Sequence, residues 1–404
     1  MISQYRGIAP KGQLELLKIL GGKLKGRSIL NINSTKAGGG VAELLHRIMP
    51  IMAGMGMKGR WEVIEGDSHF FDITKKIHNA LQGNPEKFTK EMWDYHYEIN
   101  RQNAGNLDLD AEFVFIHDPQ PVSLIRFKKN GHWIWRCHID MSAPQPDVAA
   151  RIMDYASQYE ASIFSVAKFA MLLPIPEFIV LPSIDPLSDK NRELTPDEIG
   201  EVARKFDIPP DRPMVLQVSR FDRFKDPIGV IKAYRMVKKY NDCILVLAGS
   251  PAKDDPEGEE VLDEVQNFAE GDPDIRILLL PSFSDTDINA LQRLATIVLQ
   301  KSLKEGFGLT VSEAMWKGKP VIGGAVGGIP HQIVHGVNGF LVYSEEGAAF
   351  RIRQYLNNSD MLGRMGEAAR EHVRNNFLIT RQVGDYLSIC VGVENAGKAV
   401  IEVG

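Results

Sequence analysis

The fold of this chain is decided by the stretch Glu305-Gly306-Phe307-Gly308-Leu309-Thr310-Val311-Ser312-Glu313-Ala314-Met315. An apolar segment, 296–300, precedes this stretch, and a second apolar segment, 320–323, follows it. The pattern predicts a buried strand, a glycine-punctuated loop, the start of a helix and another buried strand. In a parallel α/β sheet such a loop lies at the carboxyl edge of the strands, where ligands bind. A helix that begins near Thr310 would direct its backbone N–H groups toward an anion such as a phosphate.

The same stretch also has a purely structural interpretation. Thr310 and Glu313 have the spacing of a capping box, in which the threonine hydroxyl caps the helix and the glutamate reaches back. Gly306 and Gly308 could serve only as turn residues. The motifs found in the rest of the chain favour a ligand-binding role for this loop.

Length and composition limit the possible classes of protein. The chain has 404 residues, of which 44% are hydrophobic, which suggests two domains with sizeable cores. Its formal net charge of −5 argues against a general nucleic-acid binder. The three cysteines, Cys137, Cys243 and Cys390, lie far apart in apolar surroundings, as is typical of reduced thiols in a cytoplasmic protein. Because no apolar run approaches the length of a membrane span, we expect no membrane association.

A run of three glycines follows the first predicted strand. The strand covers 28–33, the glycines are Gly38, Gly39 and Gly40, and a helix is predicted over 41–53. Glycine lets backbone amides approach an anion closely, because no Cβ intervenes. The run matches neither the G-x-G-x-x-G fingerprint nor a Walker loop. A plain tight turn is the alternative, but three successive glycines exceed what a turn requires, so the run favours ligand contact.

Two neighbouring predicted strands, 112–116 and 133–137, each end in a histidine and an aspartate. The first is followed by His117-Asp118 and the second by His138 and Asp140. Polar groups at the carboxyl ends of adjacent strands line the same site, so at least one pair is expected to touch ligand.

No metal site is expected. Asp108-Leu109-Asp110 invites comparison with a metal-binding Asp-x-Asp motif, but it precedes a strand instead of following one. A solvated loop is the better interpretation of this segment.

The second half of the chain restarts the alternation of strands and helices near 184–192. A strand over 214–219 is followed by Arg220 and Lys225. Arginine is a flat, two-pronged donor and lysine a compact charge, and together they suit a diphosphate. With the helix start at Thr310 they would stabilise a departing nucleoside diphosphate. A surface pair is the alternative, since Arg223 lies between them.

The fold class predicted from this alternation is α/β, with two doubly wound domains over 1–186 and 187–379. The segments Val218-Ser219-Arg220-Phe221 with Lys225, Glu305 through Ala314, and the glycines of 323–328 resemble the family-4 retaining glycosyltransferases of the GT-B fold. More narrowly, the chain resembles trehalose glycosyltransferring synthases and their trehalose phosphorylase relatives in segments 33–43, 116–121, 135–140 and 305–323. The likeness covers nearly the whole chain.

This resemblance implies two Rossmann-like domains that face each other across a deep cleft, with a final helix near 380–404 crossing back onto the first. It implies that Arg220 and Lys225 hold a diphosphate and that Glu313 binds ribose hydroxyls. Glu305 would contact hydroxyls of the donor sugar, His138 the transferred sugar, and Asp140 that sugar or the acceptor. The remaining residues expected to contact substrate are Gly38, Gly39, Gly40, Asp118, Gly306, Phe307, Gly308, Leu309 and Thr310.

The activity implied by the resemblance is the reversible transfer of glucose from a nucleoside-diphosphate glucose to free glucose, which gives α,α-trehalose. Retention would follow from front-face substitution, with the leaving phosphate taking the acceptor's proton. No tightly bound cofactor is expected, and Mg²⁺ would stimulate, if at all, through the diphosphate. A homodimer is implied. One departure is Gly324, where relatives commonly have arginine, so donor affinity or choice is expected to differ.

Four alternatives remain open, one of which is a related α-glycosyltransferase that uses another acceptor. A trehalose phosphorylase would use glucose 1-phosphate, and ribose recognition by Glu313 would then serve no purpose. An epimerase or hydrolase on the same scaffold would turn over the donor without an acceptor. A non-catalytic sugar- or nucleotide-binding protein would be expected to have lost at least one of Glu305, Arg220, Lys225 and His138.

Overall fold

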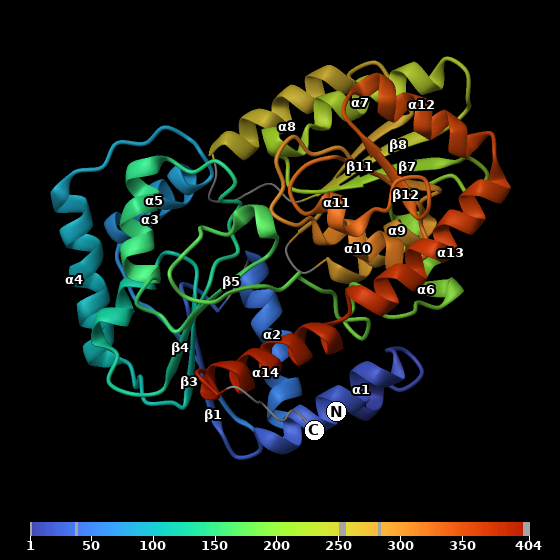
Figure 1. Ribbon diagram of the computed structural model, residues 1–404. Helices are drawn as coiled ribbons and strands as arrows, with labels where there is room; N and C mark the ends of the chain where they lie inside the picture. Colours follow the sequence, from blue (N-terminus) through green and yellow to red (C-terminus); the bar gives the residue numbers. More distant parts are fainter. Residues whose placement is uncertain (1, 37–38, 250–255, 282–283, 399–404) are drawn as a thin grey trace. The chain divides into compact units, whose positions relative to one another are not determined.

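The computed structural model describes residues 2–36, 39–249, 256–281 and 284–398, which form two compact α/β units (Figure 1). Unit 1 comprises Met1–Pro182 and Ile379–Gly404, and unit 2 comprises Ser183–Leu378. The expected boundary after residue 186 lies four residues later than this division. The reason is that Ile184 bridges to Leu378 and donates its N–H to the carbonyl of Phe377 (2.8 Å), which ties this segment to unit 2.

Unit 1 is built on a six-stranded parallel sheet with the order β2-β1-β3-β4-β5-β6. Its strands are β1 (Ser28–Asn33), β2 (Lys58–Val63), β3 (Phe113–His117), β4 (His132–Arg136), β5 (Ala161–Phe164) and β6 (Glu177–Ile179). Its helices are η1 (Ile2–Tyr5), α1 (Lys11–Lys23), α2 (Gly39–Gly54), α3 (Ser68–Leu81), α4 (Lys90–Asn106), η2 (Val122–Phe127), α5 (Pro146–Ala156), η3 (Ala167–Phe169) and α14 (Ile379–Glu394).

Unit 2 is built on a second six-stranded parallel sheet, with the order β12-β11-β10-β7-β8-β9. Its strands are β7 (Met214–Val218), β8 (Ile244–Gly249), β9 (Ile275–Leu279), β10 (Ile297–Gln300), β11 (Val321–Gly324) and β12 (Gly339–Val342). Its helices are α6 (Pro196–Lys205), η4 (Arg223–Lys225), α7 (Pro227–Lys238), α8 (Pro256–Ala269), α9 (Asp285–Leu294), α10 (Leu309–Trp316), α11 (Ile329–Gln332), α12 (Glu345–Leu356) and α13 (Ser359–Asn376).

These elements confirm the predicted class of two doubly wound α/β domains. Every residue of β3 and of β7 is buried, as expected for parallel strands that helices cover on both faces. Trp133 and Trp135 of β4 enter one core of unit 1, and Phe115 of β3 packs on the other face against Tyr386 of α14 (ring centroids 5.3 Å apart). Helix α14 also packs against α1 and α2, so the final helix is part of unit 1.

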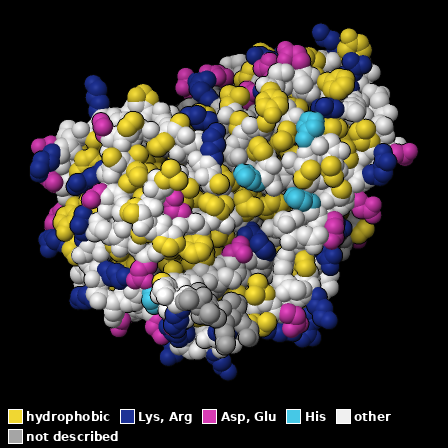
Figure 2. All heavy atoms as spheres, in the orientation of Figure 1, with side chains coloured by type: hydrophobic (Ala, Val, Ile, Leu, Met, Phe, Trp, Pro, Cys, Tyr) yellow, Lys and Arg dark blue, Asp and Glu magenta, His cyan; other side chains and the backbone are white. Residues whose placement is uncertain are grey.

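The surface carries mixed charges. On the face shown in Figure 2, Lys and Arg side chains are interspersed with Asp and Glu side chains. No helix within the described part of the chain combines the length and apolar character that a membrane crossing needs.

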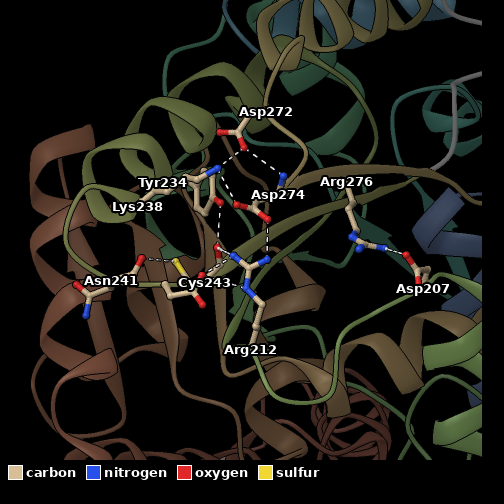
Figure 3. Close-up of polar contacts among 10 residues, drawn as sticks. Asp207, Arg212, Tyr234, Lys238, Asn241, Cys243, Asp272, Asp274 and Arg276 are labelled. Carbon is tan, nitrogen blue, oxygen red and sulfur yellow. Dashed lines mark hydrogen bonds and ion pairs between the residues drawn. The ribbon is translucent and has the colours of Figure 1, made fainter.

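An ion-pair network joins the starts of three strands of unit 2 (Figure 3). Arg212, before β7, donates to Asp274, before β9 (2.6 Å), and to Asp242, before β8 (2.5 Å). Lys238 at the end of α7 contacts Asp272 (2.5 Å) and Asp274 (2.7 Å). Hydrogen bonds from Arg212 and then Lys238 hold the pKa of the Asp274 carboxyl well below its ordinary value of 3.8.

The substitution Asp274→Asn should lower the free energy of unfolding at pH 7 by about 1–2 kcal/mol, because it weakens charge-assisted hydrogen bonds from both Arg212 and Lys238. The matched control is Asp207→Asn, since the Asp207 side chain is 94% exposed and pairs with Arg276 (3.1 Å). The control should change stability by less than about 0.5 kcal/mol.

The sign of the pH dependence follows from the depressed pKa of Asp274 in the folded state. Its contribution is present above the carboxyl's ordinary pKa and is lost as the pH falls below that value. Urea unfolding at pH 7 and at stepwise lower pH should show the difference between wild type and Asp274→Asn shrinking in acid. Equal losses for the two variants at pH 7 would contradict a stabilising network.

Candidate active site

The strand order of unit 2 reverses between β7 and β10, which are parallel neighbours. Loops that leave the carboxyl ends of two such strands diverge and open a space for ligand. Arg220 and Lys225 follow β7, and Glu305 follows β10. The structure therefore places these three predicted residues at the switch point of this sheet.

Lys225 and Glu305 form a close ion pair. The Lys225 Nζ lies 2.6 Å from Glu305 Oε2, and Ser302 Oγ donates to the same oxygen (3.1 Å). The two charged side chains are only 17% and 9% exposed. Because burial weakens solvent screening, the ammonium and the carboxylate act strongly on each other and on any ligand that reaches them.

The backbone of Lys225 is held from two sides. Its N–H donates to Asp222 Oδ1 (3.1 Å), and its carbonyl accepts from Gln217 Nε2 in β7 (2.8 Å). Arg220 behaves differently, since its side chain is 61% exposed and pairs with the nearby Asp222 (3.2 Å). Lys225 is thus fixed in place, whereas Arg220 can reorient toward a ligand.

The loop after β10 depends on two glycines with positive φ. Gly308 (φ +80°) is the N-cap residue of α10, and a side chain there would strain the backbone. Gly327 (φ +53°) approaches so closely that a Cβ would lie 1.6 Å from the Glu305 carbonyl oxygen. The N–H of Gly328 donates to the carbonyl of Gly306 (3.0 Å). The 323–328 glycines therefore support the loop that carries Glu305.

The capping-box interpretation of Thr310 and Glu313 was wrong. Helix α10 begins at Leu309, with Gly308 as its N-cap and no side-chain capping bond, so Thr310 is already the second helical residue. A left-handed glycine has taken the position that the threonine would need. Phe307 is 7% exposed and packs on Phe377, so its side chain anchors the loop.

Glu313 is 4% exposed and has cations nearby. Lys190 Nζ lies 4.0 Å from Glu313 Oε1. Lys317 Nζ donates to the Glu313 carbonyl (3.1 Å) and to Asn191 Oδ1 (3.0 Å). Burial lowers the pKa of Lys317 to about 7, against the opposing effect of the Glu313 carboxylate. Capping therefore does not explain the buried Glu313 carboxylate, which lies near the Lys190 ammonium.

The structure gives a steric reason for a glycine at position 324, at the end of β11. A Cβ at this position would lie 2.5 Å from the carbonyl oxygen of Ser302. Ser302 in turn donates to Glu305. A side chain at position 324 would therefore displace the segment that holds the Glu305 carboxylate.

The sheet of unit 1 reverses its strand order between β1 and β3, which makes that point its switch. Gly40 lies in the first turn of α2, where an added Cβ would meet nothing within 4 Å. Gly39 is the first residue of the same helix, and Gly38 lies outside the described residues. Gly40 therefore leaves open space beside the start of a helix that follows β1.

Asp118 and His138 meet at the carboxyl ends of β3 and β4. Asp118 Oδ1 accepts from the His138 backbone N–H (2.7 Å), and Asp118 adopts a left-handed backbone (φ +65°), which is uncommon for a residue other than glycine. Burial raises the pKa of Asp118 to about 6, while burial and then Arg136 hold the pKa of His138 well below its ordinary value. Asp140, two residues after His138, accepts from the N–H of Ser142 (2.9 Å).

Two further polar residues belong to this site: Asn31, which was not predicted, and His117, which was predicted only as part of a His-Asp pair. His117 Nδ1 lies 3.1 Å from His138 Nε2, and His117 Nε2 lies 2.9 Å from Asn31 Oδ1. Sequence reasoning noticed His117 only as part of a His-Asp ending. The signal that points to it is the adjacency of β1, β3 and β4, because residues at equivalent ends of neighbouring strands come together.

Asp108 and Asp110 lie before β3, at the ends of the strands opposite to the candidate site. Asp108 pairs with Arg60, and Asp110 Oδ1 accepts from Asn130 Nδ2 (2.8 Å). Across the ranges that the structure describes, no group of three or more His, Cys, Asp or Glu side chains is arranged to hold a metal ion.

Comparisons with known proteins identify the family of this chain. Residues 31–171 match the family model of the trehalose synthase N-terminal domain, and residues 198–372 match the model of glycosyl transferases group 1. A trehalose synthase from Pyrococcus horikoshii is 42% identical over 399 residues, covering 96% of this chain and 95% of that protein. A trehalose phosphorylase from Grifola frondosa is 30% identical over 438 residues, covering 92% of this chain but 58% of that protein.

Solved structures of glycosyltransferases share the fold of this chain. A glycosyltransferase from Rickettsia africae superposes with a TM-score of 0.73 at 17% identity, covering 92% of this chain and all of that one (100%). At this identity the likeness concerns the fold alone, which is GT-B. The match at 42% identity over nearly the full length of both proteins carries the closer assignment. The chain therefore belongs to the trehalose synthase family of GT-B glycosyltransferases.

Proposed function

We propose that this chain transfers a glucosyl group from a nucleoside-diphosphate glucose to free glucose and forms α,α-trehalose with retention of configuration. The observation that carries the proposal is the buried pair of Lys225 and Glu305 (2.6 Å) at the switch point of unit 2, followed closely in sequence by α10. A fixed cation suits the diphosphate of a donor, and a fixed carboxylate suits the hydroxyls of its sugar.

The departing diphosphate is the group that most needs stabilisation in this reaction. Lys225 supplies a positive charge that is already in place before the donor binds, so little reorganisation accompanies bond cleavage. Arg220, with its exposed side chain, supplies a two-pronged donor that swings onto phosphate oxygens. The N-terminus of α10 adds backbone N–H groups and the positive end of the helix dipole.

Glu305 has the contacts of a positioning group. Its Oε2 accepts hydrogen bonds from both Lys225 and Ser302, and these bonds withdraw charge from the carboxylate. Such a carboxylate binds sugar hydroxyls well and is a weakened nucleophile. The proposed step is therefore front-face substitution: the bond from the anomeric carbon to the diphosphate oxygen breaks while the acceptor oxygen attacks the same face. The leaving phosphate takes the acceptor's proton.

Glu313 would accept hydrogen bonds from the ribose hydroxyls of the donor. The carboxylate is buried in the first two turns of α10, where capping does not account for it. This role distinguishes the proposal from the second candidate, a trehalose phosphorylase, which the 30% identity to the Grifola frondosa protein keeps in consideration. A phosphorylase would have no ribose to recognise.

The unit 1 residues are proposed to bind sugar. His138 is neutral at pH 7 because its pKa is far below that pH. It can therefore hydrogen-bond a sugar hydroxyl, and it carries no positive charge that would attract the diphosphate. Asp118 fixes the His138 backbone, Gly40 keeps the start of α2 open, and Asp140 is proposed to lie near the transferred sugar or the acceptor.

The remaining parts of the proposal concern setting and assembly. The transfer is reversible and needs no resident cofactor, and Mg²⁺ would act only through the donor diphosphate. The chain is proposed to work in the cytoplasm as a homodimer with nucleoside-diphosphate glucose, glucose and trehalose as its ligands. Light scattering of the purified chain tests the dimer directly.

The first test supplies glucose with UDP-, ADP- or GDP-glucose in separate reactions, and with glucose 1-phosphate in a parallel one. Trehalose should form from at least one nucleotide donor. The substitution Lys225→Ala should lower kcat/KM for that donor by about 100-fold, because it removes a fixed cation beside the leaving group. The matched control is Lys232→Ala, a lysine whose side chain is 47% exposed on α7 and pairs with Glu345.

The control should retain wild-type kinetics, and both variants should be checked for folding by thermal unfolding. Trehalose from glucose 1-phosphate alone would assign the chain to the phosphorylases. A donor consumed without any glucose acceptor would indicate an epimerase or a hydrolase.

The second test concerns the ribose. The substitution Glu313→Gln should raise the KM for the nucleotide donor by about tenfold or more, because a charged hydrogen bond to a hydroxyl is replaced by a neutral one. The KM for glucose should stay the same. Glu371→Gln on α13 is the control, since that side chain is 56% exposed and pairs with Arg374 in the same helix. An unchanged donor KM in Glu313→Gln would refute the ribose assignment.

A further inference from the structure

Three polar side chains of unit 1 form a line at its switch point. Asn31 lies in β1, His117 ends β3 and His138 follows β4. Asn31 Oδ1 is 2.9 Å from His117 Nε2, and His117 Nδ1 is 3.1 Å from His138 Nε2. The two imidazole rings are nearly parallel, at 19°. Asn31 and His117 are 2% and 1% exposed, so bulk water does not reach most of this line.

The direction of these hydrogen bonds follows from the number of protons available. Asn31 Nδ2 faces the sulfur of Met49 (3.2 Å), a weak acceptor, so its oxygen faces His117. An oxygen can only accept, so His117 must carry its proton on Nε2. A neutral imidazole has one such proton, which leaves a lone pair on His117 Nδ1. That lone pair must accept from His138, so the His138 proton lies on Nε2.

Both rings are neutral near pH 7. Burial lowers the pKa of His117 to about 3, and burial also holds the pKa of His138 well below its ordinary value. Each ring therefore has one donor and one acceptor, and the chain of bonds uses three of these four groups. The group that remains is the lone pair on His138 Nδ1.

We propose that Asn31 and His117 are positioning residues that hold His138 in the Nε2–H tautomer, so that its Nδ1 accepts a hydrogen bond from a hydroxyl group of a bound sugar. An ionised phosphate oxygen has no proton to donate, so this tautomer favours a hydroxyl over a phosphate at that position. The hydrogen bonds that link Asn31, His117 and His138 are called the relay below. Asp118 complements the relay by fixing the His138 backbone (2.7 Å). The identity of the ligand rests on the proposed function, whereas the tautomer does not.

The tautomer is tested without substrate, by long-range ¹H–¹⁵N correlation spectra of the full chain labelled with ¹⁵N-histidine. The signals are assigned by loss in His117→Gln and His138→Gln. Wild-type His117 and His138 should each show a protonated Nε2 and an unprotonated Nδ1. A proton on Nδ1 of His138 would overturn the proposal, and the tautomers are read from the wild-type spectrum, with the two variants used only for assignment.

A second experiment replaces Asn31, the residue of the relay farthest along it from His138. Asn31→Leu is nearly isosteric and removes the acceptor, so the His138 nitrogen shifts should move toward a mixture of tautomers. Asn31→Asp retains an acceptor oxygen and should restore the wild-type shifts. The control is Asn103→Leu, which replaces another buried asparagine of unit 1 (3% exposed) and should leave the shifts unchanged. Unchanged shifts in Asn31→Leu would refute a role for Asn31.

Kinetics connect the tautomer to binding. With the nucleotide donor and glucose saturating in turn, Asn31→Leu should raise the KM of one sugar substrate by about tenfold, the effect of one lost hydrogen bond. Asn31→Asp should recover part of this loss in step with its spectrum. If the chain shows the predicted tautomers but makes no trehalose from any donor, the relay is supported and the proposed function is contradicted. A tenfold loss with wild-type shifts would contradict the relay alone.

Discussion

The reversal of strand order beside the first strand of each sheet is the constraint on which this structure depends. A parallel sheet brings all strand ends of one kind to one edge, and helices cover both of its faces. Loops at that edge can diverge only where the chain leaves two neighbouring strands toward opposite sides of the sheet. In unit 2 this point separates β7 from β10, and in unit 1 it separates β1 from β3. Every residue of both candidate sites lies on or follows one of these strands or its immediate neighbour.

The charges at the two edges of the unit 2 sheet serve different purposes. The Lys225–Glu305 pair is mostly buried, and burying two charges costs solvation energy that their attraction only partly returns. A pair of this kind is a poor stabiliser and a good site for ligand, because each charge is already oriented. The network around Arg212 is more exposed and joins the starts of three strands, where its hydrogen bonds hold the sheet edge together.

Much of the fold could be predicted from the sequence because buried parallel strands appear as short apolar runs. The loop at Glu305 was placed correctly after β10 for this reason. The helix was predicted to begin near Thr310 and begins at Leu309, but its cap was predicted wrongly, because Thr310-Glu313 and Thr195-Glu198 have the same spacing. Only Thr195 forms the capping box, since Gly308 adopts a left-handed conformation that the sequence does not reveal. A φ angle depends on the packing of the whole loop.

The polar relay of unit 1 shows a second limit. Asn31 and His117 are 86 residues apart, and a buried asparagine in an apolar strand gives no periodic signal. Their contact follows from strand order, which local patterns do not determine. Similarly, the boundary of the units was predicted four residues late, because a bridge between Ile184 and Leu378 depends on a partner almost two hundred residues away.

The return of α14 to unit 1 has a consequence for the order in which the newly made chain folds. Unit 2 is a continuous segment, so it can complete its core while the chain is still being synthesised. Unit 1 cannot, because α14 buries eleven of its residues, most of them apolar, against elements made far earlier. The first unit to leave the ribosome is thus the last to be completed, and until then its core lacks this helix. Throughout the synthesis of unit 2, a chaperone that recognises exposed apolar surface would meet the part of this core that the helix later covers.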